Sequence, residues 1–240
     1  MKVIHIAGFS NTGKTTFITK LLPELEKLGP VGVIKHIGHH GYSLPEGKDT
    51  TRFFAAGAAA SAGIDARKSV LLLQENDLER VLELLCDAGM QYAVVEGFKE
   101  KPYPKIVIGH VPGAEHIILK DPSVEDVLAH LGEFSDLVTP EGLSKEIQRD
   151  CTPGMTTLVS TIAIHRNSPK EKITDLREEL DERIRELGDV SARLEYSGNN
   201  DAGSPLKLII GVCAPDPRLA IEVALLATDL LIRFITGEEE

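Results

Sequence analysis

The chain has 240 residues, of which 42% are hydrophobic and 26% are charged, so it is long enough for one large or two small globular domains. Its formal net charge of −11 argues against a nucleic-acid-binding surface as its main feature, and no nucleic-acid partner is expected. The three cysteines, Cys86, Cys151 and Cys213, lie far apart and match no disulfide framework or zinc spacing, so we expect reduced thiols in a cytoplasmic protein.

The first half of the chain alternates strands and helices. An apolar strand over 2–7 leads through a glycine-rich loop into a helix whose leucines recur at helical spacing until Gly29-Pro30 ends it. Further strands are predicted over 31–35, 60–65, 69–73, 91–96, 105–108 and 116–119, and helices over 49–58, 77–88 and 123–131. This alternation predicts an α/β fold in which a mostly parallel sheet is flanked by helices.

The second half follows a different pattern. Residues 133–154 have weak periodicity and contain two prolines, so we take them as a linker or domain edge between a domain over 1–132 and a module over 155–240. A strand over 156–164, a helix over 169–187, strands over 190–196 and 206–212 and a helix over 216–235 predict a small α+β module of β-α-β-β-α order. The apolar run over 221–235 is too short to span a membrane, so no membrane partner is expected.

The loop after the first strand, GFSNTGKT at 8–15, is a complete P-loop of the form G-x-x-x-x-G-K-[ST]. Gly8 and Gly13 let the backbone turn tightly, so that successive N–H groups can point at a phosphate, and the helix that follows adds its N-terminal dipole. Lys14, expected to be exposed, can reach the terminal phosphates, and the Thr15 hydroxyl can hold Mg²⁺. A glycine-rich turn with a chance lysine is disfavoured, because strand and helix flank the motif in the order that it requires.

A loop rich in histidine follows the second strand. Lys35, His36, His39 and His40 stand in the block KHIGHH, and Asp49 follows in the block GKD. The imidazoles and Lys35 can donate to a phosphate-bearing ligand, bind a transition metal, or belong to a polar loop without a ligand. Asp49 is either the N-cap of the next helix or a carboxylate that serves Mg²⁺.

A carboxylate ends the buried strand over 91–96. Glu96, in the block VVEGFK, has the placement of the P-loop acid that holds Mg²⁺ or orients a nucleophilic water, and Gly97 permits close approach. Lys99 and Lys105 can meet an anionic ligand or be surface charges. Because ligands bind beyond the carboxyl ends of parallel strands, the P-loop and the loops after Lys35 and Glu96 are expected to meet at one site.

Three blocks in this order, GFSNTGKTT, VIKHIGHHGYSLPEGKDTTRFFAAGA and VVEGFKEKPYPKI, resemble the molybdopterin-guanine dinucleotide biosynthesis protein B family over residues 1–131. The resemblance implies a P-loop GTP-binding homodimer that helps a separate molybdenum cofactor guanylyltransferase attach GMP to molybdopterin. It implies that Asp49 and Glu96 are the acidic partners of the metal and that His36, His39 and His40 lie in the pocket, to which Lys35 and Lys99 add positive charge. It further implies that GTP phosphates and Mg²⁺ are bound by Gly8, Asn11, Thr12, Gly13, Lys14, Thr15 and Thr16.

The sequence departs from other GTPases in one respect. It contains no N-K-x-D motif, which usually selects guanine, so the preference for GTP over ATP follows from the resemblance alone. Residues 175–235 resemble part of the molybdopterin synthase large subunit, but Asp216-Pro217 replaces the usual residues and its lysine-bearing tail has no counterpart. We therefore expect a degenerate, non-catalytic module for docking or dimerisation, with an unrelated α+β dimerisation module as the alternative.

The leading functional interpretation is an accessory protein with weak, Mg²⁺-dependent GTPase activity, in which Lys14 and Glu96 serve the in-line attack of water on the γ-phosphate. The matched blocks contain no obvious arginine finger or water-orienting glutamine, which favours slow turnover. One alternative is a P-loop kinase or ligase acting on a small anionic metabolite held by His39, His40 and Lys99. Another is a regulatory switch whose C-terminal module binds a protein partner.

Overall fold

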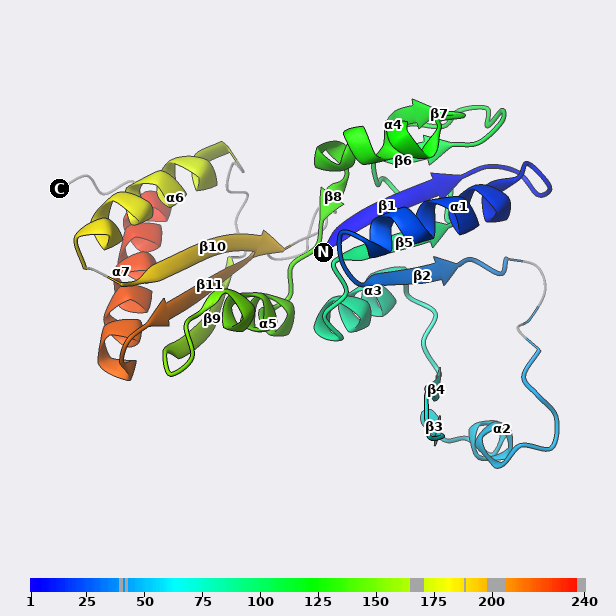
Figure 1. The fold of residues 1–240 in the computed structure, drawn as a ribbon, viewed down its shortest axis with the longest axis horizontal. Coiled ribbons are helices and arrows are strands. Elements are labelled where there is room, and N and C mark those ends of the chain that lie inside the picture. Colours follow the sequence, from blue (N-terminus) through cyan, green and yellow to red (C-terminus); the bar gives the residue numbers. More distant parts are fainter. Residues whose placement is uncertain (39–40, 42, 165–170, 188, 198–205, 237–240) are drawn as a thin grey trace. The chain divides into compact units, whose positions relative to one another are not determined.

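The computed structural model describes residues 1–38, 41, 43–164, 171–187, 189–197 and 206–236. These residues form two compact units (Figure 1). The first, which we call the P-loop unit, comprises Ile4–Leu84 and Ala93–Phe134. The second, which we call the C-terminal unit, comprises Met1–Val3, Leu85–Tyr92 and Ser135–Glu240.

A mostly parallel sheet forms the centre of the P-loop unit. It contains the strands β1 (Lys2–Ala7), β2 (Val31–Lys35), β5 (Tyr92–Glu96), β6 (Lys105–Val107) and β7 (Ile117–Lys120), in the order β2-β5-β1-β6-β7. β1 pairs with β6 in parallel, with His5 opposite Lys105, and β6 pairs with β7 in parallel. These five strands are those expected from the apolar runs, so the predicted α/β fold is confirmed. A sixth strand, β8 (Ser135–Asp136), which was not predicted, pairs antiparallel with β1.

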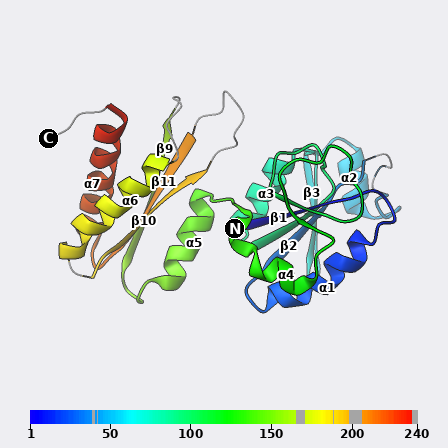
Figure 2. The same cartoon turned by 90° about the horizontal axis from the view of Figure 1, so that it is seen from above.

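Three helices flank the sheet. They are α1 (Lys14–Glu26), α3 (Leu78–Asp87) and α4 (Val124–Ala129). Figure 2 shows α1 and α4 on one face of the sheet and α3 on the other. α1 buries Ile18, Leu21 and Leu25, which recur at helical spacing and form its apolar face. Ser123 caps α4 in a reciprocal capping box with Asp126, which satisfies two backbone N–H groups at the start of this short helix.

The chain between β2 and α3 forms a small separate layer. It consists of α2 (Asp49–Ala55) and an antiparallel pair, β3 (Ala60–Ile64) and β4 (Ser69–Leu73). Both strands lie where the sequence predicts them. α2 ends at Ala55, before the predicted 58, because Gly57 turns the chain with a φ of 106°.

From residue 156 on, the C-terminal unit has the predicted β-α-β-β-α order. Its elements are β9 (Thr156–Ile164), α6 (Glu171–Ile184), β10 (Ser191–Ser197), β11 (Leu206–Ala214) and α7 (Pro217–Thr236). The antiparallel sheet has the order β10-β11-β9, with β11 in the middle. Alternate residues of β11 face two cores: Leu208 and Ile210 pack with α6 and α7, whereas Ile209 packs with the helix described next.

Residues 133–154, predicted as a linker or domain edge, contain regular structure. A short 3₁₀ turn, η1 (Leu131–Glu133), leads to β8 (Ser135–Asp136) and then to the helix α5 (Pro140–Asp150). Thr139 is the N-cap of α5 and accepts a hydrogen bond from the Gly142 N–H, and Pro140 occupies the first turn. The helix was missed because only Leu143 and Ile147 are buried on it, which leaves a weak periodic signal.

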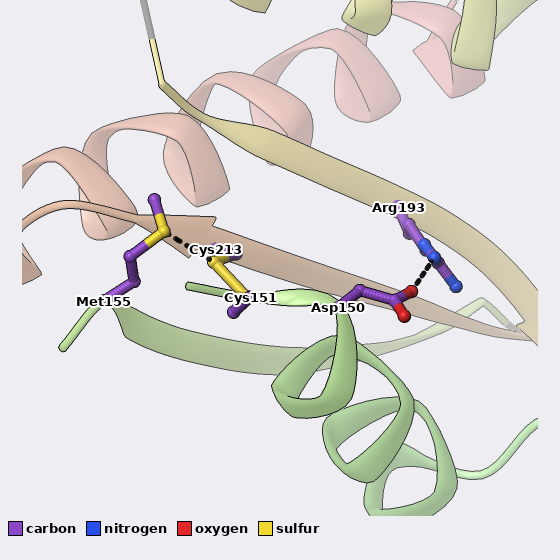
Figure 3. The surroundings of a disulfide bond; sticks show 5 residues. All are labelled: Asp150, Cys151, Met155, Arg193 and Cys213. Atoms are coloured by element: carbon purple, nitrogen blue, oxygen red, sulfur yellow. Dashed lines mark hydrogen bonds and ion pairs between the residues drawn. A yellow bond between two sulfur atoms is a disulfide. The ribbon is translucent and has the colours of Figure 1, made fainter. Parts of the chain in front are cut away.

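The expectation of three reduced cysteines is wrong for two of them. Cys151 and Cys213 form a disulfide across 62 positions of sequence, as Figure 3 shows, while Cys86 is a free, buried thiol. α5 packs on β11, and this packing brings its C-cap, Cys151, beside Cys213. The thioether of Met155 lies 3.6 Å from the Cys213 sulfur. Spacing along the sequence carries no sign of this pair, because the fold alone brings the two residues together.

Within the described ranges, no helix is both long enough and apolar enough to cross a lipid bilayer.

Candidate functional site

The backbone of the P-loop has the conformation that a phosphate-binding loop requires. Asn11 and Gly13 have φ angles of 64° and 88°, in the left-handed region, and α1 begins at the next residue, Lys14. A Cβ atom on Gly8 would lie 2.7 Å from the carbonyl oxygen of Ile108, so only glycine fits there. The loop therefore directs N–H groups and the positive end of a 13-residue helix toward one point.

A cavity of about 770 Å³ lies at this point. It lies at the carboxyl ends of β1, β2 and β5, which confirms the prediction that the three strand-end loops meet at one site. Its volume is in the range of small-molecule sites, which run from about 300 to 1,000 Å³. The lining residues are Gly8, Ser10, Asn11, Gly13, Lys14, Thr15, Thr16, Lys35, His36, Gly38, Glu96, Gly97, Phe98, Lys99 and Glu100.

Lys14 is buried rather than exposed, which corrects the expectation for this side chain. It is only 8% exposed, and its Nζ donates a hydrogen bond of 2.6 Å to the carbonyl of Phe9 within the same loop. Burial lowers the pKa of its ammonium group; Glu96 opposes this shift, and the charges of Lys99 and Lys35 add to it. Three lysines thus share one cavity, and an anionic ligand would relieve their mutual repulsion.

Glu96 lies at the centre of the predicted metal-binding group. Its side chain is 12% exposed, and Oε2 accepts a 3.4 Å hydrogen bond from the Thr15 hydroxyl. The same oxygen lies 3.5 Å from Nζ of Lys35, which is largely exposed. Hard oxygen atoms from a hydroxyl and a carboxylate suit Mg²⁺, which also keeps water and phosphate ligands. Thr15 and Glu96 therefore fit the metal that the P-loop implies.

The loop after β5 approaches the loop after β2 very closely. Gly97 has a φ of 104°, and a Cβ atom on it would lie 2.5 Å from Cβ of His36. The His36 ring stacks on Phe98, with centroids 4.2 Å apart and an interplanar angle of 15°. Lys99 completes the connection to the P-loop, since its Nζ lies 3.9 Å above the Phe9 ring. Aromatic contacts thus join all three loops around the cavity.

Some predicted site residues lie elsewhere. Thr12 donates its hydroxyl proton to the Phe9 carbonyl, and its side chain braces the P-loop instead of lining the cavity. Asp49 is the first residue of α2, next to the N-cap Lys48, and its exposed carboxylate lies 3.5 Å from Arg52. The structure does not bring Asp49 to the cavity. His39 and His40 lie outside the described residues.

Lys105 has a different role from the predicted one. It is 2% exposed, and its Nζ donates to the carbonyls of Lys99 and Lys101 at 2.9 and 2.7 Å. Burial chiefly lowers the pKa of this ammonium group, and Glu100 and Glu115 oppose the shift. The lysine supports the loop from beneath and does not meet a ligand in the cavity.

Sequence reasoning missed five lining residues as site members. They adjoin the motifs that it identified: Ser10, Gly38, Gly97, Phe98 and Glu100. Their position within or next to the P-loop, the KHIGHH block and the VVEGFK block was the available signal. Among the described residues, no cluster of three or more histidine, cysteine, aspartate or glutamate side chains is placed to hold a metal. Mg²⁺ held by Thr15 and Glu96 would keep water and phosphate oxygens as further ligands.

The part of the chain that contains the cavity is similar to known proteins. The sequence pattern described as molybdopterin guanine dinucleotide synthesis protein B matches residues 3–132. A Bacillus subtilis protein named "Probable molybdopterin-guanine dinucleotide biosynthesis adapter protein" is 43% identical over 110 residues, which cover 44% of this chain and 64% of that protein. An Escherichia coli protein named "Molybdopterin-guanine dinucleotide biosynthesis adapter protein" is 33% identical over 122 residues, covering 46% of this chain and 69% of that one.

A solved structure is also similar to part of the chain. The crystal structure of Bacillus subtilis MobB is similar at 29% sequence identity, with a TM-score of 0.45, over 56% of this chain and 99% of that chain. The chain matches less than two thirds of the length of the Bacillus subtilis adapter protein, at 64%. The matching residues, 3–132, contain all fifteen residues that line the P-loop cavity.

Proposed function

This chain belongs to the molybdopterin guanine dinucleotide synthesis protein B family, and we propose that its P-loop cavity binds GTP together with Mg²⁺. The observation that carries the proposal is the meeting of Lys14, Thr15 and Glu96 in one cavity of about 770 Å³. Each of these side chains has the chemistry that a nucleoside triphosphate site needs. An ammonium group faces the phosphates, and a hydroxyl and a carboxylate face the metal.

The chain's own residues have distinct tasks in this site. The N–H groups of 11–16 bind the phosphates, and Nζ of Lys14 exchanges the Phe9 carbonyl for a phosphate oxygen. Thr15 and Glu96 hold Mg²⁺, which supplies further positive charge against the phosphates when it is bound. Lys35 and Lys99 add charge at the cavity wall, and His36 is available as a further donor.

Slow GTP hydrolysis fits this arrangement. Glu96 can orient a water molecule for in-line attack on the γ-phosphate, while Lys14 stabilises the charge that develops on the phosphate oxygens. Among the described residues the cavity is lined by lysines but by no arginine that could act as a finger. We therefore propose a weak GTPase activity that accompanies binding rather than a fast turnover.

The biological role that we propose is that of an adapter in the synthesis of the guanine dinucleotide form of the molybdenum cofactor. Two matched relatives carry the name of such an adapter. In this role the chain, as a homodimer, would present GTP to a molybdenum cofactor guanylyltransferase that attaches GMP to molybdopterin. The guanine preference rests on family membership. The cytoplasmic location was predicted from reduced cysteines, and the Cys151–Cys213 disulfide removes that support.

The adapter role is tested by reconstitution. Purified chain is added to a guanylyltransferase, molybdopterin, GTP and Mg²⁺, and the rate of GMP attachment is measured. The wild-type chain should raise the rate, and Lys14→Ala should not. If the γ-phosphate of labelled nucleotide instead appears on a small metabolite, the protein is a kinase and the adapter role is refuted.

A further inference from the structure

The loop after β5 rests on two buried polar side chains that the nucleotide chemistry does not use. His5 on β1 is fully buried, and Lys105 on β6 is 2% exposed. They are register partners on adjacent parallel strands, so their side chains emerge on the same face of the sheet. Both reach the backbone of the loop that follows Glu96. Two polar groups buried side by side beneath one loop require an explanation, because burying them costs free energy.

The two side chains bind alternate carbonyls of this loop. Nε2 of His5 lies 2.5 Å from the carbonyl oxygen of Gly97, and Nζ of Lys105 donates to the carbonyls of Lys99 and Lys101 at 2.9 and 2.7 Å. Three backbone acceptors at positions 97, 99 and 101 are thus held by β1 and β6. The loop is fixed from below at every second residue, and the side chains of Phe98 and Lys99 contact His36 and Phe9 of the neighbouring loops.

The contact with Gly97 sets the tautomer of His5. A carbonyl oxygen only accepts, so the proton of the neutral ring stands on Nε2. Nδ1, the other ring nitrogen, is then also buried. A leucine or phenylalanine would avoid the cost of burying two polar ring nitrogens, so core packing alone does not account for a histidine here.

We infer that His5 and Lys105 are positioning residues that hold the loop 96–100 in the geometry that binds nucleotide. This inference rests on the proposed function of the P-loop cavity. The loop contributes Glu96, Gly97, Phe98, Lys99 and Glu100 to the cavity, one third of its fifteen lining residues. Without His5 and Lys105, the side chains of Glu96 and Lys99 would lose their fixed positions. Nucleotide binding would then have to order the loop, which lowers the affinity.

The test compares GTP affinity with loop order in matched variants. Lys105→Met keeps the length of the side chain and removes both donors, whereas Lys105→Arg keeps the charge and donors. Lys101→Met is the control, because it removes the ion pair between this loop and Glu79 of α3 but leaves the Lys101 carbonyl for Lys105. Each variant is titrated with GTP and Mg²⁺, and amide hydrogen exchange is followed in peptides from 97–104 and from β1.

We expect Lys105→Met to weaken GTP binding by about tenfold or more, since two charge-assisted hydrogen bonds are lost. Amide hydrogen exchange in Lys105→Met should accelerate in 97–104 while β1 stays protected. Lys105→Arg should recover part of the GTP affinity, and Lys101→Met should bind GTP like the wild type. His5→Leu is the second variant if Lys105→Met does not fold. It removes the donor to Gly97, so GTP binding should weaken and exchange in 97–104 should accelerate while β1 stays protected.

The outcomes separate the inference from the function on which it rests. If the wild-type chain does not bind GTP, the proposed function fails. If the wild type binds and Lys105→Met and His5→Leu bind equally well, with unchanged exchange in 97–104, the positioning role is refuted. A general rise in exchange across β1 and the loop together would assign the two residues to stability alone and would also overturn it.

Discussion

Replacement of Gly97 by alanine should damage both the stability and the ligand affinity of the P-loop unit. The residue has a φ of 104°, which an L-residue adopts at a cost of about 1–3 kcal/mol. The new Cβ would also lie 2.5 Å from Cβ of His36, an atom next to the backbone that cannot rotate away. The loops after β2 and β5 would have to separate, at a further cost of about 1–3 kcal/mol. Together these terms predict a loss of about 2–6 kcal/mol in the free energy of unfolding.

A neighbouring glycine provides the control for this experiment. Gly38 also lines the cavity, but a Cβ atom there would lie 3.7 Å from Cε1 of His36, an ordinary contact distance. Gly38→Ala should therefore unfold within about 0.5 kcal/mol of the wild type. Urea denaturation followed by circular dichroism gives the free energies of unfolding, and titration with GTP and Mg²⁺ gives the affinities. A Gly97→Ala protein as stable as Gly38→Ala would refute the reasoning about the close approach of the two loops.

Three further predictions concern the acid, the disulfide and the buried histidine. Glu96→Gln should slow GTP hydrolysis more than it weakens GTP binding, because the carboxylate serves Mg²⁺ or the attacking water; an unchanged hydrolysis rate would remove Glu96 from the mechanism. The Cys151–Cys213 disulfide closes a loop across 62 positions of sequence, so its reduction should lower the free energy of unfolding of the C-terminal unit by up to about 4 kcal/mol. Urea denaturation with and without a dithiol reductant measures this difference, and Cys86→Ser should leave it unchanged. Burial chiefly lowers the pKa of His5 below its ordinary value of 6.5; the carbonyl of Gly97 and Glu100 oppose this shift, and Lys105 adds to it. As the pH falls through 6.5, the unfolded chain therefore binds a proton at His5 that the folded chain does not bind. The stability that His5 contributes is therefore complete above 6.5 and is lost below it, and His5→Leu should flatten the fall in stability between about pH 7.5 and 5.5; an equal fall in both proteins would contradict this.

The parts of the site that the sequence predicts correctly are those encoded locally. The P-loop needs its two glycines, its lysine and its threonine within eight positions, between a strand and a helix, and all of these lie in one continuous segment. Glu96 was identified for the same reason, since it ends an apolar strand. The parallel sheet then brings the segments together, because the carboxyl ends of neighbouring strands share one edge.

The features that sequence analysis missed depend on contacts between distant segments. Lys105 carries a charge that is expected at the surface, and only the register of β1 and β6 places it beneath the loop after β5. Cys151 and Cys213 meet because α5 packs on β11. For α5 itself a local signal existed, since Thr139-Pro140 is a favourable N-cap followed by proline in the first turn. The helix was nevertheless not predicted, because it has too few apolar positions to show a helical periodicity.

The central claim, that the P-loop cavity is a GTP site, is tested most directly by calorimetric titration of the full chain with GTP and with ATP in the presence of Mg²⁺. The account predicts GTP binding that exceeds ATP binding and that is lost in Lys14→Ala. Because Lys14 is buried, the variant must first show a wild-type circular dichroism spectrum. Undiminished GTP binding by a folded Lys14→Ala protein would contradict the account, and a preference for ATP would contradict its assignment of the base.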